Sequence, residues 1–371
     1  MITWRNGTVV SLGRSWAGAL ELTVSTQDGE RRALAHPELV GTPEPGDRVL
    51  LNVSAQARGL GTGGYALVVA LPDRLPADPP PGPGHLVKAR YTPLQTMVLG
   101  VDEQESAHHA VLRDADDLSR LPVVVADLHS ALPAVLAGAR HEARVAGRRP
   151  PRAVYVMTDG GALPAWFSRT VAGLRGSGWL DACVTVGQAF GGDLEAVTVH
   201  TGLLAARHVL DAELVVLAQG PGNLGTGTRW GFSGVAAGEA INAAGVLGGL
   251  PVASLRVSGA DARDRHRGVS HHSLTAYGRV ALHPADVVVP VAGADEPWRA
   301  ALLRQVREQV AVLGSPGGPH RLVEVATGPD LRRALEECPV GLSTMGRGLD
   351  EDPESFLAAA AAGVHATRLL D

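Results

Sequence analysis

The densest cluster of residues that can do chemistry in this chain comprises Arg265, Arg267, Ser270, His271 and His272. The two guanidinium groups can hold a phosphate or a carboxylate through paired hydrogen bonds. Either of the adjacent histidines can serve as a general acid or base, because imidazole titrates near neutral pH. Adjacent side chains on a helix diverge by about 100°, so we expect that the two rings do not bind one metal ion. The serine is interpreted either as part of the ligand-facing loop or as the N-cap of a helix.

Small and polar residues follow four successive apolar segments that we interpret as parallel strands. In an open α/β sheet, ligands bind outside the carboxyl ends of the strands. The acidic and imidazole side chains near these ends include Asp127, His129, Asp159 and Asp193. We expect His129 to contact a ligand, and Asp159 or Asp193 to act as a base or a metal ligand. Their oxygen and nitrogen atoms suit Mg²⁺, Mn²⁺ or Zn²⁺, but no HExxH-like motif specifies a metal, so a divalent ion stays an open alternative.

The longest of these strand-end loops is rich in glycine and covers residues 219–228. Its candidate ligand-binding residues are Gly220, Gly222, Asn223, Gly225, Thr226 and Thr228. Successive backbone N–H groups, together with the two threonine hydroxyls, can surround a phosphate or a carboxylate. The alternative is a glycine-rich turn that serves backbone geometry alone.

Common cofactor motifs are weak or missing. Residues 220–225 fit the GxGxxG pattern, but the loop continues to Gly234 and the acidic residue expected about 20 positions later is missing, so NAD(P) is the less favoured cofactor. No GxxxxGK[ST] or GxSxG string occurs, which argues against a P-loop NTPase and a serine hydrolase. Lys88 is the only lysine, so pyridoxal phosphate (PLP) would have to use this residue and is not expected.

The composition predicts a folded cytoplasmic protein with a large core. Of the 371 residues, 45% are hydrophobic and 19% are charged, so wholesale disorder is not expected. The net charge of −5 argues against binding to nucleic acid or anionic membranes through bulk electrostatics. The N-terminal residues do not resemble a signal peptide, and no apolar run reaches the roughly 18 residues that span a bilayer. Two cysteines are too few for a disulfide framework or a cysteine metal cluster.

Three successive segments are expected. Residues 1–75 predict a small antiparallel β-barrel of the SH3-like or OB-like kind, because about five short strands alternate with turn sequences. Residues 76–84 are rich in proline and glycine and predict a stiff linker. Residues 85–371 predict a mostly parallel, Rossmann-like sheet with helices on both faces, including a helix over 194–210. The strands expected in this sheet are Thr96–Gly100, Pro122–Ala126, Ala153–Met157, Ala182–Val186, Leu214–Ala218, Val252–Leu255, Val287–Val291 and Leu322–Val325.

Several strings resemble one uncharacterised bacterial family, a domain of unknown function found mainly in actinobacteria and firmicutes. These strings are Lys88–Gln95, Leu128–Ser130, Met157–Gly160, Gly187–Ala196, Gly220–Gly234, Arg265–Leu282 and Thr344–Gly348. The resemblance covers nearly the whole chain from the linker onward and, more loosely, the barrel. It implies a bacterial cytoplasmic origin, and it supplies no activity, cofactor or catalytic residue.

Together these residues favour an enzyme, a hydrolase or group transferase, that acts on a phosphorylated or carboxylated small molecule. The glycine-rich loop and the arginines would hold the anion, and the aspartates and histidines would move protons. A non-catalytic metabolite sensor or assembly module and an NAD(P)-dependent oxidoreductase are the alternatives. Nucleic-acid binding is not expected, because the barrel carries few aromatic residues and no basic stripe. The expectation of a homo-oligomer rests only on the frequency of such assemblies.

Overall fold

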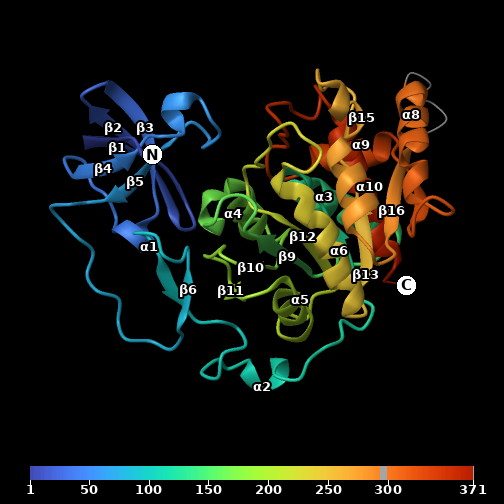
Figure 1. The fold of residues 1–371 in the computed structure, drawn as a ribbon, viewed down its shortest axis with the longest axis horizontal. Coiled ribbons are helices and arrows are strands. Elements are labelled where there is room, and N and C mark those ends of the chain that lie inside the picture. The colour runs from blue at the N-terminus through green and yellow to red at the C-terminus, as the bar shows by residue number, and fades with distance from the viewer. Residues whose placement is uncertain (293–298, 371) are drawn as a thin grey trace.

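Five strands at the N-terminal end close into a small barrel (Figure 1). In the computed structural model, which describes residues 1–292 and 299–370, these strands are β1 (Trp4–Trp16), β2 (Ala19–Thr26), β3 (Gly29–Ala35), β4 (Arg48–Asn52) and β5 (Ala66–Ala70). They pair in the order β1-β2-β3-β5-β4, and the short helix α1 (Pro37–Val40) follows β3. Leu22 and Val24 alternate with more exposed residues along β2 and pack into a core inside the barrel. The predicted β-barrel is confirmed.

A loosely structured segment connects the barrel to the main sheet. The proline-rich residues 76–84 lie between the end of β5 and strand β6 (Leu86–Lys88). Strand β6 pairs antiparallel with β7 (Thr96–Val98), and the short helix α2 (His109–Leu112) follows. The prediction of a main-sheet strand over 96–100 is therefore wrong, because residues 96–98 complete a separate two-stranded ribbon.

The main sheet contains eight parallel strands in the order β11-β10-β9-β12-β8-β13-β16-β17. They are β8 (Pro122–Val125), β9 (Ala153–Thr158), β10 (Ala182–Thr185), β11 (Leu194–Glu195), β12 (Leu214–Gln219), β13 (Leu250–Ser254), β16 (Asp286–Val291) and β17 (Arg321–Ala326). Seven of them overlap predicted strands. The eighth, β11, occupies the start of the helix predicted over 194–210, and that prediction is wrong there, because the helix begins only at Val199.

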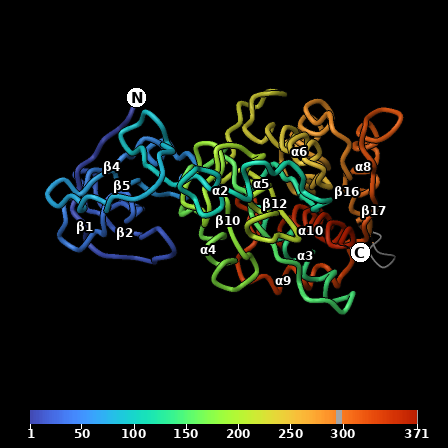
Figure 2. The backbone as a smooth tube through the Cα atoms, turned by 90° about the horizontal axis from the view of Figure 1, so that it is seen from below, coloured from blue at the N-terminus to red at the C-terminus, as the bar shows by residue number. Residues whose placement is uncertain are grey.

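Helices cover both faces of this sheet, as the sequence predicts, and α3 and α6 lie on opposite sides of it in Figure 2. The longer helices are α3 (Leu132–Val145), α4 (Arg169–Gly176), α5 (Val199–His208), α6 (Ala236–Val246), α8 (Ala300–Val310), α9 (Pro329–Glu336) and α10 (Pro353–Arg368). Val123 and Val125 of β8 pack into the core under α5, α6 and α8, whereas Val124 packs into the core under α3, α9 and α10. Across the described ranges 1–292 and 299–370, no helix combines the length and apolarity that crossing a bilayer requires.

The connections from two adjacent strands, β8 and β12, leave the sheet on opposite faces. The chain leads from β8 through α3 to β9, and from β12 through α6 to β13 on the far side of β8. Such a reversal of strand order opens a crevice at the carboxyl ends of the two strands, which is where open α/β sheets bind ligands. The residues that follow β8, β12 and β13 are therefore the first candidates for a functional site.

Candidate functional site

Asp127 lies directly after β8 and is held at the crevice by its main chain. Its carbonyl oxygen accepts a hydrogen bond from Nε2 of Gln219, the last residue of β12, at 2.7 Å. The side chain is only 4% exposed, and its Oδ2 atom has no hydrogen-bond partner among the described residues. A buried carboxylate oxygen without a hydrogen bond is costly for folding, so its presence here indicates a role beyond folding.

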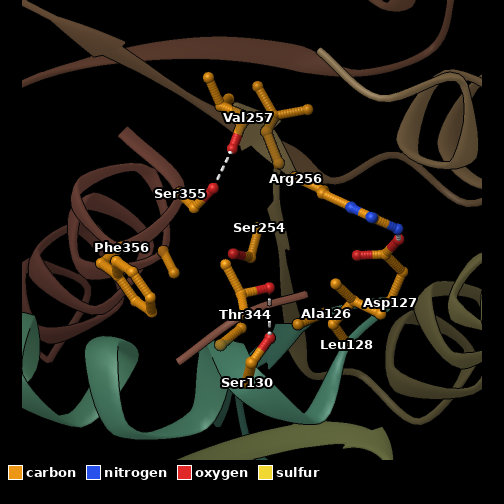
Figure 3. Close-up of a pocket in the computed structure, with 13 residues that line it drawn as sticks. Ala126, Asp127, Leu128, Ser130, Ser254, Arg256, Val257, Thr344, Ser355 and Phe356 are labelled. Atoms are coloured by element: carbon orange, nitrogen blue, oxygen red, sulfur yellow. Dashed lines mark hydrogen bonds and ion pairs between the residues drawn. The ribbon is translucent and has the colours of Figure 1, made fainter. Parts of the chain in front are cut away.

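Two cationic or titratable side chains face this free oxygen. Nη1 of Arg256 lies 4.0 Å from Oδ2 of Asp127, and Nδ1 of His272 lies 3.7 Å from the same atom. Arg256 also lies 3.2 Å from Nδ1 of His272. Figure 3 shows Arg256 reaching from the residues after β13 to Asp127. Arg256 was not among the predicted site residues, although a charged residue just beyond an apolar strand is a signal that could have identified it.

A small antiparallel ribbon brings the histidine-rich segment back to this crevice. Strands β14 (Val257–Ser258) and β15 (Gly268–Val269) pair directly after Arg256, and the short helix α7 (His271–Thr275) follows. Gly268 has a φ of +69°, a left-handed conformation that favours glycine, and a Cβ atom there would push aside the end of the Gln309 side chain, 2.3 Å away. Ser270 caps α7 by accepting the N–H of His272, which confirms the N-cap interpretation.

Three imidazole rings meet at this point. The ring centroids of His271 and His272 are 4.4 Å apart, and that of His266 lies 5.0 Å from each of them. One ring nitrogen from each histidine lies within 4.8 Å of the other two. The prediction that the adjacent rings point apart is therefore wrong. They occupy the first turn of a five-residue helix, where side chains extend past the helix end and can converge.

Burial keeps two of these rings neutral. It lowers the pKa of His266 to about 3, with a further contribution from the nearby Arg256 charge. It also lowers the pKa of His271 to about 4, with His272 and Arg265 acting in the same direction. Both rings are thus uncharged at neutral pH and keep a nitrogen lone pair.

The far end of the glycine-rich loop packs against this histidine cluster. The Phe232 ring stacks on His272 with a centroid distance of 3.8 Å and an angle of 2° between the ring planes. Its position restricts rotation of the imidazole, so Phe232 is a positioning residue that the sequence did not reveal. The side chain of Arg265 approaches the same loop, since a Cβ on Gly227 would lie 3.8 Å from its Nη2 atom. Arg265 and Arg267 are both exposed, so their guanidinium groups can reach a ligand from solvent.

The tip of the loop is a hairpin that uses its own polar groups. Gly225 pairs with Phe232, and the amide of Thr226 donates to the carbonyl of Gly231 at 2.7 Å. The hydroxyls of Thr226 and Thr228 lie 3.1 Å apart. The Thr226 amide and both hydroxyls therefore bond within the loop and do not surround an anion in this conformation.

The stem of the loop is tied to the neighbouring strands. The amide of Gly220 donates to the carbonyl of Thr158 at the end of β9. Oδ1 of Asn223 accepts from Gln219 Nε2 and from the hydroxyl of Ser233. Helix α6 begins only at Ala236, after the long loop that the sequence indicates. The GxGxxG string therefore does not lead directly into a helix as a dinucleotide site requires.

The other predicted residues lie apart from the histidine cluster. His129 bonds through Nδ1 to Tyr155 and through Nε2 to Ser168, so both ring nitrogens have protein partners. Asp159 accepts the amide of Gln188. Asp193 pairs with Arg175 and accepts the amide of Cys183, which fixes the turn between β10 and β11. Within residues 1–292 and 299–370, the strand-end set of Asp127, His129, Asp159 and Asp193 does not form a metal-binding group.

The only lysine and one of the cysteines are buried. Nζ of Lys88 donates to the carbonyls of Ala189 and Ala196 at 2.9 Å and lies 3.6 Å from the Glu195 carboxylate. Burial raises the pKa of the Cys183 thiol well above its usual range, as expected for a structural cysteine.

Two hollows border the crevice. A cavity of about 30 Å³ lies behind Asp127 and Arg256, lined also by Ser130 and Thr344 (Figure 3), and it has room for one or two water molecules. A larger, mainly apolar pocket of about 460 Å³ lies between the barrel and the strand-end loops, where Asp159 and Gly222 contribute to its wall.

Comparison with known proteins identifies the family of the chain. It gives no activity, so the possible chemistry follows only from the geometry described above. No curated protein matches the chain. The model of the family described as "Protein of unknown function (DUF3866)" matches residues 32–363, which include the part of the barrel from within β3 onward, the whole sheet and the histidine cluster. The chain therefore belongs to the DUF3866 family.

Proposed function

We propose that this protein is an enzyme, a hydrolase or group transferase, that acts on a phosphorylated or carboxylated small molecule at the crevice between β8, β12 and β13. One observation carries the proposal. The buried Asp127 carboxylate keeps an oxygen without a hydrogen bond beside His272 and Arg256, at the point where an α/β sheet binds ligands. A protein that needed only a stable core would gain from apolar residues at these positions.

The geometry supports a division of roles. Arg256 lies inside the crevice, while Arg265 stands exposed at its mouth beside Gly227. Both can hold the anionic group of the substrate. The Asp127 carboxylate orients and polarises His272, which takes the proton from an attacking water or hydroxyl oxygen. That oxygen bonds to the electrophilic phosphorus or carbon, and the leaving group departs with a proton returned by the imidazolium or by solvent.

A binding screen followed by a turnover assay tests the proposal. The full-length protein is screened by thermal shift against inorganic phosphate, nucleoside monophosphates, sugar phosphates and dicarboxylates. A ligand at about 100 times its dissociation constant adds about 2.7 kcal/mol of stability. Each compound that binds is then incubated with the protein, and products are followed by mass spectrometry, with and without a nucleophilic acceptor. We expect at least one bound compound to be converted.

Matched variants assign the residues. Asp127→Asn and His272→Gln are expected to lower turnover at least about 100-fold while changing the affinity for the bound compound only a few-fold. His200→Gln alters an exposed histidine on α5 and should change neither quantity. If the wild-type protein binds compounds from the screen and converts none, the enzyme proposal fails in favour of a metabolite sensor. If none of the anionic compounds binds, the proposed substrate class is wrong.

A further inference from the structure

Three buried or half-buried imidazoles converge without bonding to one another. No hydrogen bond joins any two of the rings of His266, His271 and His272 in the part of the chain that the structure describes, although one nitrogen of each lies within 4.8 Å of the others. Nε2 of His271 is buried and has no hydrogen-bond partner there. Ring nitrogens brought this close in a buried place gain little for folding unless something binds between them.

The remaining contacts of each ring indicate which nitrogen is available. Nδ1 of His266 lies 2.8 Å from the hydroxyl of Ser270, which leaves Nε2. Nδ1 of His272 accepts from Nη1 of Arg256 and lies near Asp127, so Nε2 is the nitrogen without a hydrogen-bond partner among the described residues, and it becomes a ligand once the ring proton moves to Nδ1. A contact at Nδ1, or packing against neighbouring side chains, thus orients each ring and leaves its other nitrogen available. Metal-binding histidines have the same arrangement, because a second group at the other nitrogen fixes their tautomer.

We propose that His266, His271 and His272 bind one divalent transition-metal ion and leave a further coordination position open toward the crevice. Three imidazole nitrogens without a thiolate suit Zn²⁺, Co²⁺, Ni²⁺ or Cu²⁺ and do not suit Mg²⁺ or Ca²⁺, which prefer oxygen ligands. Tetrahedral Zn²⁺ at about 2.0–2.1 Å from each nitrogen places the nitrogens about 3.4 Å apart. One nitrogen of each ring already lies within 4.8 Å of the other two, so the rings would have to bring these atoms closer by at most about 1.4 Å to reach this value.

The free oxygen of Asp127 fits this assignment. Binding through Nε2 of His272 puts the ring proton on Nδ1, which in this structure lies 3.2 Å from Nη1 of Arg256. A guanidinium can only donate, so Arg256 must move away from Nδ1 when the ion binds, and Oδ2 of Asp127, 3.7 Å from Nδ1, becomes the acceptor. A small rotation completes a hydrogen bond from the ring to the carboxylate, which raises the basicity of the ligand and offsets part of the charge of the ion. Asp127 and Ser270 are then positioning residues, and Phe232 keeps the His272 ring parallel to its own ring by stacking on it.

The ion would also take part in the reaction proposed above, and this catalytic role rests on the proposal that the protein is an enzyme. A divalent ion beside Arg256 and Arg265 would attract the same anionic substrates and would lower the pKa of a bound water, the nucleophile of a hydrolase. With Nε2 on the ion and Nδ1 donating to Asp127, His272 has no nitrogen left to act as the base, so in the metal-bound protein the ion takes over activation of the water and the water's proton leaves to solvent. Binding of the ion itself does not depend on any activity, so it can be tested separately.

Metal binding is measured on the full-length protein after chelation and dialysis. We expect isothermal titration with Zn²⁺ to show one site per chain, and Co²⁺ to give the intense visible bands of a tetrahedral or five-coordinate complex with nitrogen ligands. His266→Gln, His271→Gln and His272→Gln should each weaken Zn²⁺ binding at least about 100-fold. His200→Gln is the control and should bind as the wild type does. His271→Gln removes a nitrogen that has no hydrogen bond, so it is the variant best able to fold, and its circular dichroism spectrum checks this.

The outcomes separate the two proposals. A triple variant of the three histidines that binds Zn²⁺ as well as the wild type, or a wild type without a stoichiometric site, overturns the metal proposal. Stoichiometric binding without turnover of any bound compound upholds the metal site and removes the enzyme proposal. Full turnover by protein stripped of metal and kept in chelator leaves the enzyme proposal in place and rules out a catalytic ion.

Discussion

At the scale of single residues, His129 shows how a polar side chain at a strand end can serve the fold. Tyr155 donates its hydroxyl proton to the carbonyl of Gln219, so its oxygen accepts from Nδ1–H of His129. Nε2 then accepts from the hydroxyl of Ser168, which also caps α4. This chain of bonds needs a neutral ring, and burial lowers the pKa of His129 to about 4.

The neutral His129 makes stability depend on pH. Its pKa is about 4 in the folded protein against 6.5 in the unfolded chain. Below pH 6.5 the His129 ring therefore binds a proton in the unfolded chain, whereas in the folded protein it stays neutral until the pH approaches 4. The contribution of this residue is constant above about pH 7 and is lost as the pH falls, by about 2 kcal/mol at pH 5. Urea unfolding of the wild type and of His129→Gln at pH 7.5 and at pH 5.0 measures the contribution of this residue to the free energy of unfolding.

The comparison between variants isolates this group from the other histidines. We expect His129→Gln to lose about 2 kcal/mol less stability than the wild type between the two pH values. His200→Gln, on an exposed face of α5, should retain the full pH dependence of the wild type. Equal losses for the wild type and His129→Gln would show that the ring is already protonated in the folded state.

The residue types of the site could be read from the sequence, but their grouping could not. Arg265 and the two adjacent histidines stood out by density, and in the structure Arg265 lies beside Gly227 and close enough to His271 to lower the pKa of its ring. Asp159 and Asp193 follow strands in the same way as Asp127, yet they bond to Gln188 and to Arg175 instead. Which strand end faces the histidines depends on the order of strands in the sheet, and that order is set by long-range packing.

At the scale of elements, the closest helix contact joins α3 and α10. Gly138 and Gly363 lie where the two helices meet, and a Cβ on either would come within 1.9 Å of a backbone oxygen of the other helix. This approach is possible because α10 is composed largely of alanine and glycine over residues 358–363. The two helices together cover the face of the sheet opposite to α6.

Replacing Gly363 with alanine should therefore be strongly destabilising. The added methyl group would overlap the carbonyl oxygen of Val135, and the helices would have to separate. We expect Gly363→Ala to lower the free energy of unfolding by at least about 2 kcal/mol, measured by urea denaturation. Gly176→Ala, at the exposed end of α4 with open space around it, should change stability by less than about 1 kcal/mol. Similar effects for both variants would contradict the close packing.

Strand prediction succeeded for the main-sheet strands of four or more residues, whether fully buried like β8 or largely exposed like β17. Strand β8 is apolar throughout, and β9 and β12 are apolar up to their last residues, Thr158 and Gln219, because both faces of the sheet are covered. Strand β11 has two residues, and their pairing with β10 depends on the turn fixed by Asp193. A hydrophobic pattern cannot identify an element of that length.

At the scale of the whole molecule, the barrel docks on the loop that precedes α4. Nε1 of Trp16 donates to the carbonyl of Trp166 at 2.7 Å across 150 positions of sequence. Gly18, with a φ of +74°, lies against the Trp166 ring, where a Cβ would clash at 2.2 Å. Arg169 also approaches Glu21 of the barrel at 3.8 Å. The sequence indicates the barrel and the linker, but such a long-range contact leaves no local pattern.

Trp166 is expected to hold the two domains together. Trp166→Ala removes the ring that Gly18 contacts and opens a void between the barrel and the α/β domain, so the domains should separate more often. We expect proteinase K to cleave the segments at the contact, around residues 16–18 and 163–168, at least about tenfold faster than in the wild type, which corresponds to about 1.4 kcal/mol. Small-angle X-ray scattering should show a larger radius of gyration. Trp230→Ala changes a side chain that is 54% exposed and should leave both measurements unchanged. Cleavage of Trp166→Ala at the wild-type rate would mean that the domains are held together by other contacts.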